Sequence, residues 1–317
     1  VIPGFEFDEQ EVLSSNGALL LQKLPESIVI MGGGAIGVEF AHIMNSFGVK
    51  VHLVELMERI MPLEEKEISD HLRRAFVRRG IEVYTGTKVL SVKKSQDSAE
   101  VTIQKDGEQT VITVEKVLVV TGRVPNTEGI GLEKLGLETQ RGFIPVGDYG
   151  ETAVPGVYAI GDVVATPLLA HVASKEGEIA VEHIAGHETV KGIDRNAIPG
   201  AVYCEPQVAS FGYTESAAKE KGLSVTVFSF PYKGVGKSVA IGKSEGFIKL
   251  VCDATTHEIL GAHIIGAEAT ELIHEILLAK TAELLPQDIA SMVHAHPTMS
   301  EGVMESCRGI EGWAIHV

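Results

Sequence analysis

Hydrophobic and polar positions in the first 86 residues follow two periods in turn. A continuous apolar run predicts a buried strand, and a short run rich in β-branched residues also predicts a strand. Stretches with apolar residues three and four positions apart predict amphipathic helices. The predicted elements, in chain order, are a helix at 9–24, a strand at 27–31, a helix ending near 46, a strand at 49–55, a helix at 63–80 and a strand at 81–86. This β-α-β-α-β order predicts right-handed crossovers and a parallel sheet.

The pattern changes after residue 86, where apolar and polar residues alternate. Runs at 87–94, 99–107 and 109–116 are separated by polar turns and predict an antiparallel meander. The continuous apolar run Lys116–Gly122 then predicts a strand that returns to the parallel sheet.

Two further regions follow, with boundaries expected near residues 122 and 196. In the second region, the segment 157–162 predicts a buried strand and 169–186 a long helix. In the third region strands come first and helices after them, which indicates an α+β unit. Its predicted strands lie within 201–212, 224–231 and 246–266, and its predicted helices at 267–285 and 286–294.

A glycine-rich turn joins the strand at 27–31 to the following helix. Its residues GGGAIG place the glycines as Gly32-x-Gly34-x-x-Gly37. Gly32 permits the tight turn, Gly34 lets the backbone approach a pyrophosphate, and Gly37 lets helix and strand pack closely. Free N–H groups and the helix dipole favour an anion at such a helix start. The turn predicts a dinucleotide site, and the alternative is a loop that serves packing alone.

Glu55 ends the second strand, 18 positions after Gly37. A carboxylate there accepts hydrogen bonds from both hydroxyls of an adenosine ribose and repels a 2′-phosphate, which predicts NAD rather than NADP. The alternative is a solvated strand end. Glu39, two positions after Gly37, is either an ordinary helix carboxylate favoured by the dipole or a group that points towards the nicotinamide end.

Polar residues also follow two strand ends of the second region. Arg123 lies in TGRVPNT, and Gly161-Asp162 ends VYAIGD. A carboxylate after a glycine at the carboxyl end of a parallel strand can hold a sugar or polyol hydroxyl. A turn formed by Gly-Asp is the alternative, and chemistry alone leaves the role of Asp162 open.

The segment HAHPTMSE, residues 294–301, has two interpretations. Thr298 to Glu301 fits a T-x-x-E capping box, with Glu301 as the third helical residue bonded back to the threonine. A glutamate held in that way is also a rigid partner for an imidazole, so His296 and Glu301 form a candidate acid–base pair. His294 is assigned a structural role, and a lone cysteine such as Cys307 is more often a small core residue than a redox group.

Composition narrows the classes of function. The 317 residues are 44% apolar and 22% charged, which is typical of a globular protein, and carry a net charge of −16. That charge argues against nucleic acid or an anionic membrane as partner, and neither a signal peptide nor an apolar run of transmembrane length is visible. Three dispersed cysteines provide neither a disulfide framework nor metal-ligand spacing and fit a reducing cytoplasm. The first residue, Val1, indicates a processed or excised piece.

Taken together, these segments resemble the flavin-linked disulfide reductases, class I of the pyridine nucleotide-disulfide oxidoreductases. IVIMGGGAIGVEFA, VLVVTGRVPNT, VYAIGDV, PLLAHVASKEG and HAHPTMSE occur in that family's order along essentially the whole chain. Within the family, HAHPT-x-SE is similar to the signature of the dihydrolipoamide dehydrogenase branch. The resemblance implies oxidation of dihydrolipoamide with reduction of NAD, through FAD and a redox disulfide.

The resemblance also implies roles for matching residues. His296 would be the acid–base residue and Glu301 would orient it. The residues implied to contact NAD are Gly32, Gly34, Ala35, Ile36, Gly37, Glu39, Glu55, Val89 and Gly122. Those implied to contact FAD are Gly161, Asp162, Leu168, Leu169, Ala170 and His171. The implied partners are a second copy of the chain, which would complete each active site, and a dihydrolipoyl-bearing protein of a 2-oxoacid dehydrogenase or glycine cleavage complex.

The expected fold is α/β with three parts. These are a Rossmann-like NAD-binding domain with a parallel sheet and β-meander at 1–122, which includes an N-terminal linker helix, a remnant of an FAD domain at 123–196, and a C-terminal α+β dimerisation domain at 197–317. The chain departs from the family because it has one G-x-G-x-x-G and no C-x-x-x-x-C. The flavin's adenosine cradle and the redox disulfide would therefore be missing, and the chain alone would be inactive.

Two alternatives stay open. A glutathione or mercuric reductase of the same family would favour NADPH, would carry arginines where Glu55 stands, and in the mercuric case would end in a cysteine pair, which GWAIHV lacks. The other alternative is a non-catalytic NAD-binding and dimerisation module.

Overall fold

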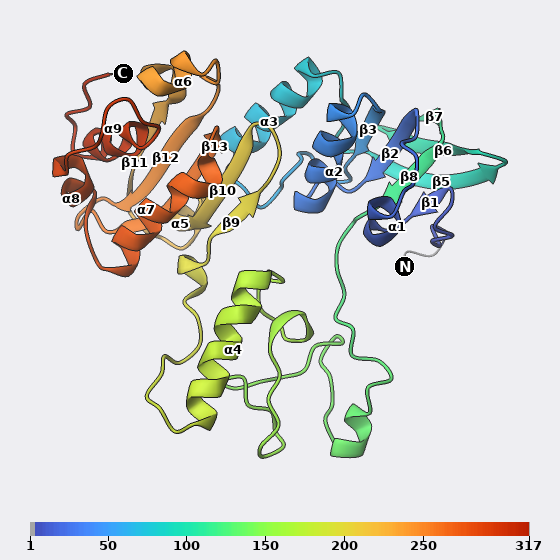
Figure 1. Ribbon diagram of the computed structural model, residues 1–317, viewed down its shortest axis with the longest axis horizontal. Helices are drawn as coiled ribbons and strands as arrows, with labels where there is room; N and C mark the ends of the chain where they lie inside the picture. The colour runs from blue at the N-terminus through green and yellow to red at the C-terminus, as the bar shows by residue number, and fades with distance from the viewer. Residues whose placement is uncertain (1–3, 317) are drawn as a thin grey trace. The chain divides into compact units, whose positions relative to one another are not determined.

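The structure, a computed structural model, describes residues 4–316 and divides into two compact units. One unit combines the chain up to Thr121 with the chain from Pro199 onward, and the other is Gly122–Ile198 (Figure 1). Two five-stranded sheets and one three-stranded sheet belong to the first unit.

A parallel sheet forms the N-terminal part of the first unit. Its strands lie in the order β1-β8-β2-β3-β4, and every neighbouring pair is parallel. The strands are β1 (Val12–Leu13), β2 (Ser27–Met31), β3 (Lys50–Val54), β4 (Glu82–Tyr84) and β8 (Lys116–Val119). The return of the run at 116–122 to this sheet is thus confirmed. Both faces of the central strands are buried, as expected for a parallel sheet with crossovers.

Two helices connect the strands of this sheet. α2 (Ala35–Ser46) links β2 to β3, and α3 (Lys66–Arg78) links β3 to β4. Both end before a glycine with positive φ, Gly48 and Gly80, the conformation that commonly stops a helix. α3 buries Ile68, Leu72 and Phe76, each four positions apart, so one face of the helix lies in the core.

The predicted meander forms the three-stranded antiparallel sheet β5 (Lys88–Ser95), β6 (Ser98–Lys105) and β7 (Glu108–Val114). Its buried residues share a core with Val29 and Met31 of β2, whereas Ile28 and Ile30 lie in the core with α2 and α3. Alternate residues of β2 therefore pack against the meander on one face and against the helices on the other, because successive side chains point to opposite faces of a sheet.

The C-terminal sheet is antiparallel in every pair and has the strand order β11-β12-β13-β10-β9. Its strands are β9 (Gly200–Val202), β10 (Gln207–Gly212), β11 (Val225–Pro231), β12 (Phe247–Asp253) and β13 (Ile259–Gly266). α7 (Ala269–Thr281) packs on β10 and β13, and α9 (Glu301–Ile310) packs on β11 and β12. Three short α-helices, α5 (Glu215–Glu220), α6 (Gly236–Ala240) and α8 (Pro286–Ser291), and the 3₁₀ turn η4 (Tyr232–Gly234) complete this part.

The two five-stranded sheets share a hydrophobic core through α3. Ile68 and Leu72 of α3 belong to the same buried cluster as Val208 of β10 and Ile265 of β13. The helix that follows the second strand of the parallel sheet is thus packed against the C-terminal sheet, which places both sheets in one unit.

The second unit is largely irregular. Besides α4 (Ala170–Ile184) it holds three short 3₁₀ turns, η1 (Leu132–Leu135), η2 (Gly161–Val163) and η3 (Arg195–Ala197). The prediction of a strand at 157–162 was wrong, because the only bridge made by this segment in the structure described is an isolated one from Tyr158 to Glu151. A strand needs a ladder of backbone hydrogen bonds to a neighbour, and within residues 4–316 no such ladder forms along it.

The helix predicted at 9–24 was also wrong over most of its length. Val12–Leu13 instead forms β1 and pairs with β8, and the helix α1 is confined to Ser15–Leu19, where Ser14 caps its start. Tertiary pairing with the sheet edge thus overrides the local helical pattern.

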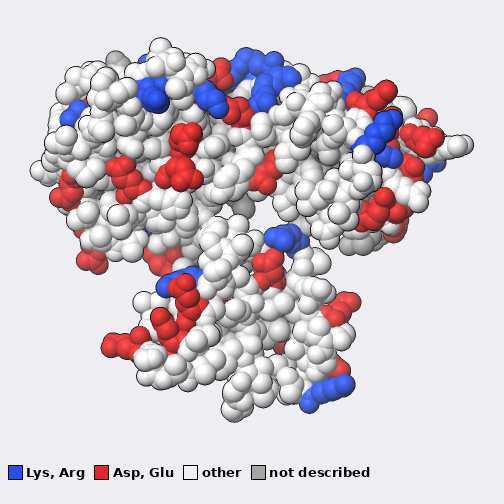
Figure 2. Space-filling model, in the orientation of Figure 1, with Lys and Arg blue, Asp and Glu red and all other residues white. Residues whose placement is uncertain are grey.

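The charged residues are unevenly spread over the visible face of the molecule. Figure 2 shows Lys and Arg gathered over α3, although the net charge of the chain is −16. Arg78, an exposed member of this helix, pairs with Glu245 at 2.6 Å, so part of the local positive charge is compensated. No helix within residues 4–316 is both long enough and apolar enough to cross a bilayer.

Candidate functional site

The glycine turn after β2 is shaped by close backbone contacts. Gly32 has φ +114°, and a Cβ there would lie 2.5 Å from the carbonyl oxygen of Val120. A Cβ at Gly37 would lie 1.7 Å from the carbonyl oxygen of Gly32. Both positions therefore require glycine, the first for the turn and the second for the contact between α2 and the turn.

Gly34 differs from its two neighbours in the motif. It stands at the N-cap of α2, and no atom lies within 4 Å of a Cβ built on it. No side chain among the described residues caps this helix start, which leaves the N–H groups at Ala35 and Ile36 without a capping partner. The arrangement leaves open space in front of free N–H donors at the positive end of a helix, where a pyrophosphate can bind.

Glu55 lies beside this turn at the carboxyl end of β3. Its Oε2 accepts the N–H of Gly33 at 2.6 Å, and its Oε1 accepts the N–H of Met57 at 2.7 Å. The residue is 9% exposed. Each carboxylate oxygen has a second lone pair, so ribose hydroxyls can still donate to Glu55. The sequence did not predict that the backbone N–H groups of Gly33 and Met57 hold Glu55, because backbone donors leave no signature in residue type.

Glu39, in the second turn of α2, is bonded to the C-terminal part of the unit. Its Oε1 accepts the N–H of Tyr203 at 2.9 Å, from the segment between β9 and β10. One oxygen of this carboxylate thus joins α2 to the second sheet, and its predicted position at the nicotinamide end stays a prediction.

Two other residues expected to contact NAD lie further along the chain. Val89 is on β5 and packs, half-buried, against the core between the parallel sheet and the meander. Gly122 has φ +151° and begins the second unit. Their contact with NAD stays a prediction.

In the second unit, Asp162 and Arg123 form an ion pair, with Arg123 Nη1 3.4 Å from Asp162 Oδ2. Gly161, at φ +71°, donates its N–H to Glu176 Oε2 of α4 at 2.7 Å. This bond fixes the Gly161-Asp162 turn against the helix that begins at Ala170. The half-buried residues Leu168 and Leu169 lead into that helix, and Ala170 and His171 are exposed on its first turn.

His296 and Glu301 are brought together as the spacing predicts. His296 Nδ1 lies 2.9 Å from Glu301 Oε1, while Glu301 Oε2 accepts the N–H of Thr298 at 2.9 Å. Burial acts to raise the pKa of Glu301, but the Thr298 N–H and the His296 imidazole outweigh it, so that pKa lies below its ordinary value. An ionised carboxylate only accepts hydrogen bonds, which requires the proton of a neutral imidazole to be on Nδ1 and leaves Nε2 able to accept one.

The capping interpretation of this segment needs correction. The N-cap of α9 is Ser300 and the helix begins at Glu301, so Glu301 is its first residue and not its third. Thr298 Oγ1 donates to the carbonyl of Ala295 and does not accept an N–H of α9. Only the bond from the Thr298 N–H to Glu301 resembles a capping box. The carboxylate therefore holds the turn before the helix, beside the exposed imidazole.

The side chain of the first histidine of the segment, His294, is buried. The side chain of His294 is 3% exposed, and its Nε2 lies 2.8 Å from Glu275 Oε1 of α7. By contrast, the side chain of His296 is 75% exposed. The burial agrees with the structural role assigned to His294.

The three cysteines, Cys204, Cys252 and Cys307, are all buried free thiols. Burial raises the pKa of the Cys252 thiol to about 12, and it raises the pKa values of the other two as well. Such thiols are poor nucleophiles, because the thiolate is the reactive form. None of them fits a redox disulfide, in agreement with the core role of Cys307.

The chain is similar to known proteins along most of its length. Residues 1–177 match the family described as pyridine nucleotide-disulphide oxidoreductase, and residues 198–307 match the dimerisation domain of that family. The dihydrolipoyl dehydrogenase of Bacillus subtilis is 42% identical over 318 residues, which cover 100% of this chain and 67% of that protein. The dihydrolipoyl dehydrogenase of Corynebacterium glutamicum is 43% identical, and the match covers 99% of this chain and 68% of that protein.

Solved structures with a similar fold are also known. LpdA (Rv3303c) from Mycobacterium tuberculosis matches with a TM-score of 0.90 and 25% identity, over 98% of this chain and 67% of that protein. The HOCl-induced flavoprotein disulfide reductase RclA from Escherichia coli matches with a TM-score of 0.88 and 25% identity, over 97% and 70%. The chain thus spans about two thirds of the length of each of these four proteins.

Proposed function

This chain belongs to the pyridine nucleotide-disulphide oxidoreductase family, and from that premise we propose that it supplies the NAD site, part of the flavin site and the acid–base histidine of a dihydrolipoyl dehydrogenase. The observation that carries the proposal is the His296–Glu301 pair, which is the acid–base device that oxidation of a dithiol requires. The family's cofactors are NAD and FAD.

The residues around α2 suit NAD. Gly34 leaves room for the pyrophosphate, the start of α2 offers N–H donors, and Glu55 offers lone pairs for the ribose hydroxyls. For FAD, Asp162 and the first turn of α4 would hold the ribityl and isoalloxazine groups. When bound, the flavin and the nicotinamide transfer the two electrons of the reaction.

The chain's own chemistry is proton transfer. Oxidation of dihydrolipoamide to lipoamide releases two electrons and two protons, and reduction of NAD⁺ takes up both electrons and one of the protons. The thiol must first become a thiolate. Nε2 of His296 accepts that proton, and Glu301 stabilises the imidazolium and keeps the ring in position. Because the three cysteines are buried and unpaired, we expect the 317 residues alone not to turn over.

The functional unit is a homodimer in this proposal. Residues 198–307 match a dimerisation domain, and the imidazole of His296 faces outward, where a second subunit can bring its dithiol site to it. The lipoyl group would be carried by a protein of a 2-oxoacid dehydrogenase or glycine cleavage complex. Free buried thiols fit a cytoplasmic location.

The test is oxidation of dihydrolipoamide by flavin-loaded enzyme that contains this chain, with NAD⁺ as acceptor. Turnover with dihydrolipoamide, and at least tenfold less with glutathione, would support the proposal. Loss of that preference, or NADPH-linked glutathione reduction at a higher rate, would favour another member of the family.

A further inference from the structure

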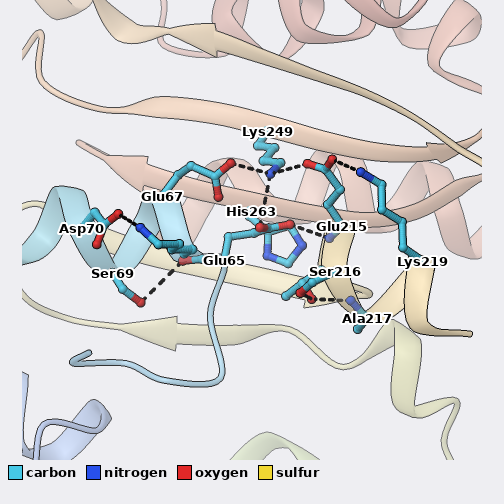
Figure 3. A network of polar contacts seen from close by, with 12 residues as sticks. Glu65, Glu67, Ser69, Asp70, Glu215, Ser216, Ala217, Lys219, Lys249 and His263 are labelled. Atoms are coloured by element: carbon cyan, nitrogen blue, oxygen red, sulfur yellow. Dashed lines mark hydrogen bonds and ion pairs between the residues drawn. The ribbon is translucent and has the colours of Figure 1, made fainter. Parts of the chain in front are cut away.

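Lys249 of β12 is a buried cation surrounded by three carboxylates. Its side chain is 2% exposed, and Nζ lies 2.9 Å from Glu215 Oε2, 3.0 Å from Glu67 Oε1 and 3.2 Å from Glu65 Oε2 (Figure 3). Burial acts to lower the pKa of this lysine, but the carboxylates outweigh it and hold the pKa above its ordinary value. Lys249 is therefore charged at neutral pH.

The cluster joins the two sheets of the first unit. Glu65 and Glu67 lie at the start of α3, the helix that connects β3 and β4 of the parallel sheet. Glu215 is the first residue of α5 in the C-terminal part. Apolar residues of similar volume often stabilise a buried contact at least as well as an ion pair does. What the charged cluster adds is a directional constraint on the start of α3.

Further bonds attach the same segment to the C-terminal part. Glu65 Oε1 accepts the N–H of Glu215 at 2.6 Å, and Glu64 Oε1 accepts the hydroxyl of Ser210 at 3.1 Å. The strand register places Ser210 and Lys249 beside the same residue of β13, one on either side. Residues 64–67 are thus held along one row of the C-terminal sheet.

Residues 60 and 61, which precede residues 64–67, lie against the glycine turn. The N–H of Met61 donates to the carbonyl of Gly33 at 2.8 Å, and a Cβ at Gly33 would lie 2.9 Å from Ile60 Cγ2 and 3.0 Å from Glu55 Cβ. Met61 is linked back to α3, because its carbonyl accepts the N–H of Glu64 at 3.1 Å and the hydroxyl of Ser69 at 3.0 Å. A continuous path of contacts therefore runs from Lys249 to Glu55.

We propose that Lys249 is a positioning residue for the dinucleotide site, which holds segment 56–65 against the glycine turn and Glu55 by fixing Glu65 and Glu67. The affinity for the adenosine half of NAD thus depends on a lysine of the other sheet. This inference rests on the proposed NAD site. A loosened segment must be ordered again when the ligand binds, and that cost weakens binding.

The test compares dissociation constants of NADH and ADP-ribose for the 317-residue chain by calorimetry, well below the melting temperature. Lys249→Met should weaken both ligands about tenfold, by the same factor, because the affected part of the site binds the half that they share. Glu65→Gln leaves Lys249 paired with Glu67 and Glu215, so it should fold even where Lys249→Met does not, and it should weaken both ligands about threefold. Arg308→Met is the matched control, because it breaks the ion pair that half-buried Arg308 makes with buried Glu305 in α9. It should lower the melting temperature and leave both constants unchanged.

Parental affinity for ADP-ribose in the folded Glu65→Gln and Lys249→Met variants would overturn the inference and leave the NAD site intact. An equal loss of affinity in Arg308→Met would also overturn it, since the effect would then follow from destabilisation alone. Failure of the parent chain to bind either ligand would overturn the NAD site and, with it, the role of Lys249.

Discussion

Glu301 holds the imidazole of His296 with one carboxylate oxygen, at 2.9 Å, and the backbone of Thr298 with the other, also at 2.9 Å. The carboxylate is thus bonded to the turn on one side and to the ring on the other. An imidazole held in this way has its proton on the nitrogen that faces the carboxylate and a basic nitrogen on the opposite side.

Replacing His296 by Gln in flavin-loaded enzyme is expected to lower the rate of dihydrolipoamide oxidation by about 10²- to 10⁴-fold, since a positioned base contributes that much. Affinity for NADH should not change, because the residue lies on the C-terminal part, away from the glycine turn. His274→Gln, at an exposed position of α7, is the control. Steady-state kinetics give the rate, and turnover like that of the parent would remove His296 from the mechanism.

The matched pair Gly34→Ala and Gly37→Ala separates ligand binding from packing. Gly34→Ala places its Cβ in open space, so stability should change by less than about 0.5 kcal/mol, while NADH binding should weaken about tenfold or more because the methyl occupies the phosphate's approach. Gly37→Ala should instead destabilise the fold by about 3 kcal/mol, because its Cβ would meet the Gly32 carbonyl. Urea unfolding and NADH titration measure the two effects, and unchanged NADH binding by Gly34→Ala would contradict the site.

The choice between NAD and NADP is assigned to Glu55. The parent chain should bind NADH at least about tenfold more tightly than NADPH, since the carboxylate accepts from ribose hydroxyls and repels a 2′-phosphate. Glu55→Gln should reduce this ratio, because it removes the charge and can accept only one of the two backbone N–H groups, of Gly33 and Met57, that the carboxylate accepts. Titrations with both nucleotides test the prediction, and equal or tighter binding of NADPH by the parent chain would show it to be wrong.

Asp8 should contribute stability that depends on pH. Burial opposes ionisation of this carboxyl, but the Lys94 ammonium and the N–H groups of Val12 and Gln10 outweigh it and lower the pKa from 3.8 to about 2. Because folding lowers the pKa, the stabilisation is present above pH 4 and is lost as the pH falls towards 2. Asp8→Asn should lower the melting temperature by about 2 °C at pH 7 and by less at pH 2. Equal shifts at both values, by scanning calorimetry, would contradict this assignment.

Features that depend on neighbours in the chain followed from the sequence. Continuous apolar runs located β2 and β8, because a strand buried on both faces favours apolar residues at successive positions. Enrichment in β-branched residues located β3. The spacing of the three glycines located the turn, since the contact between Gly37 and Gly32 joins residues only five positions apart in the chain. His296 and Glu301, five positions apart, could be paired because one tight turn and a helix start separate them.

Features that depend on distant partners were decided by the tertiary structure. Val12–Leu13 becomes a strand only because β8 lies alongside, and 157–162 does not become one because no strand pairs with it. Glu39 meets Tyr203, and Glu65 meets Lys249, across sheets that the apolar pattern described separately. Hydrophobic period and turn chemistry act over a few residues, whereas the bonds of Glu39 and Glu65 require residues of two sheets to lie together, so no local pattern specifies them.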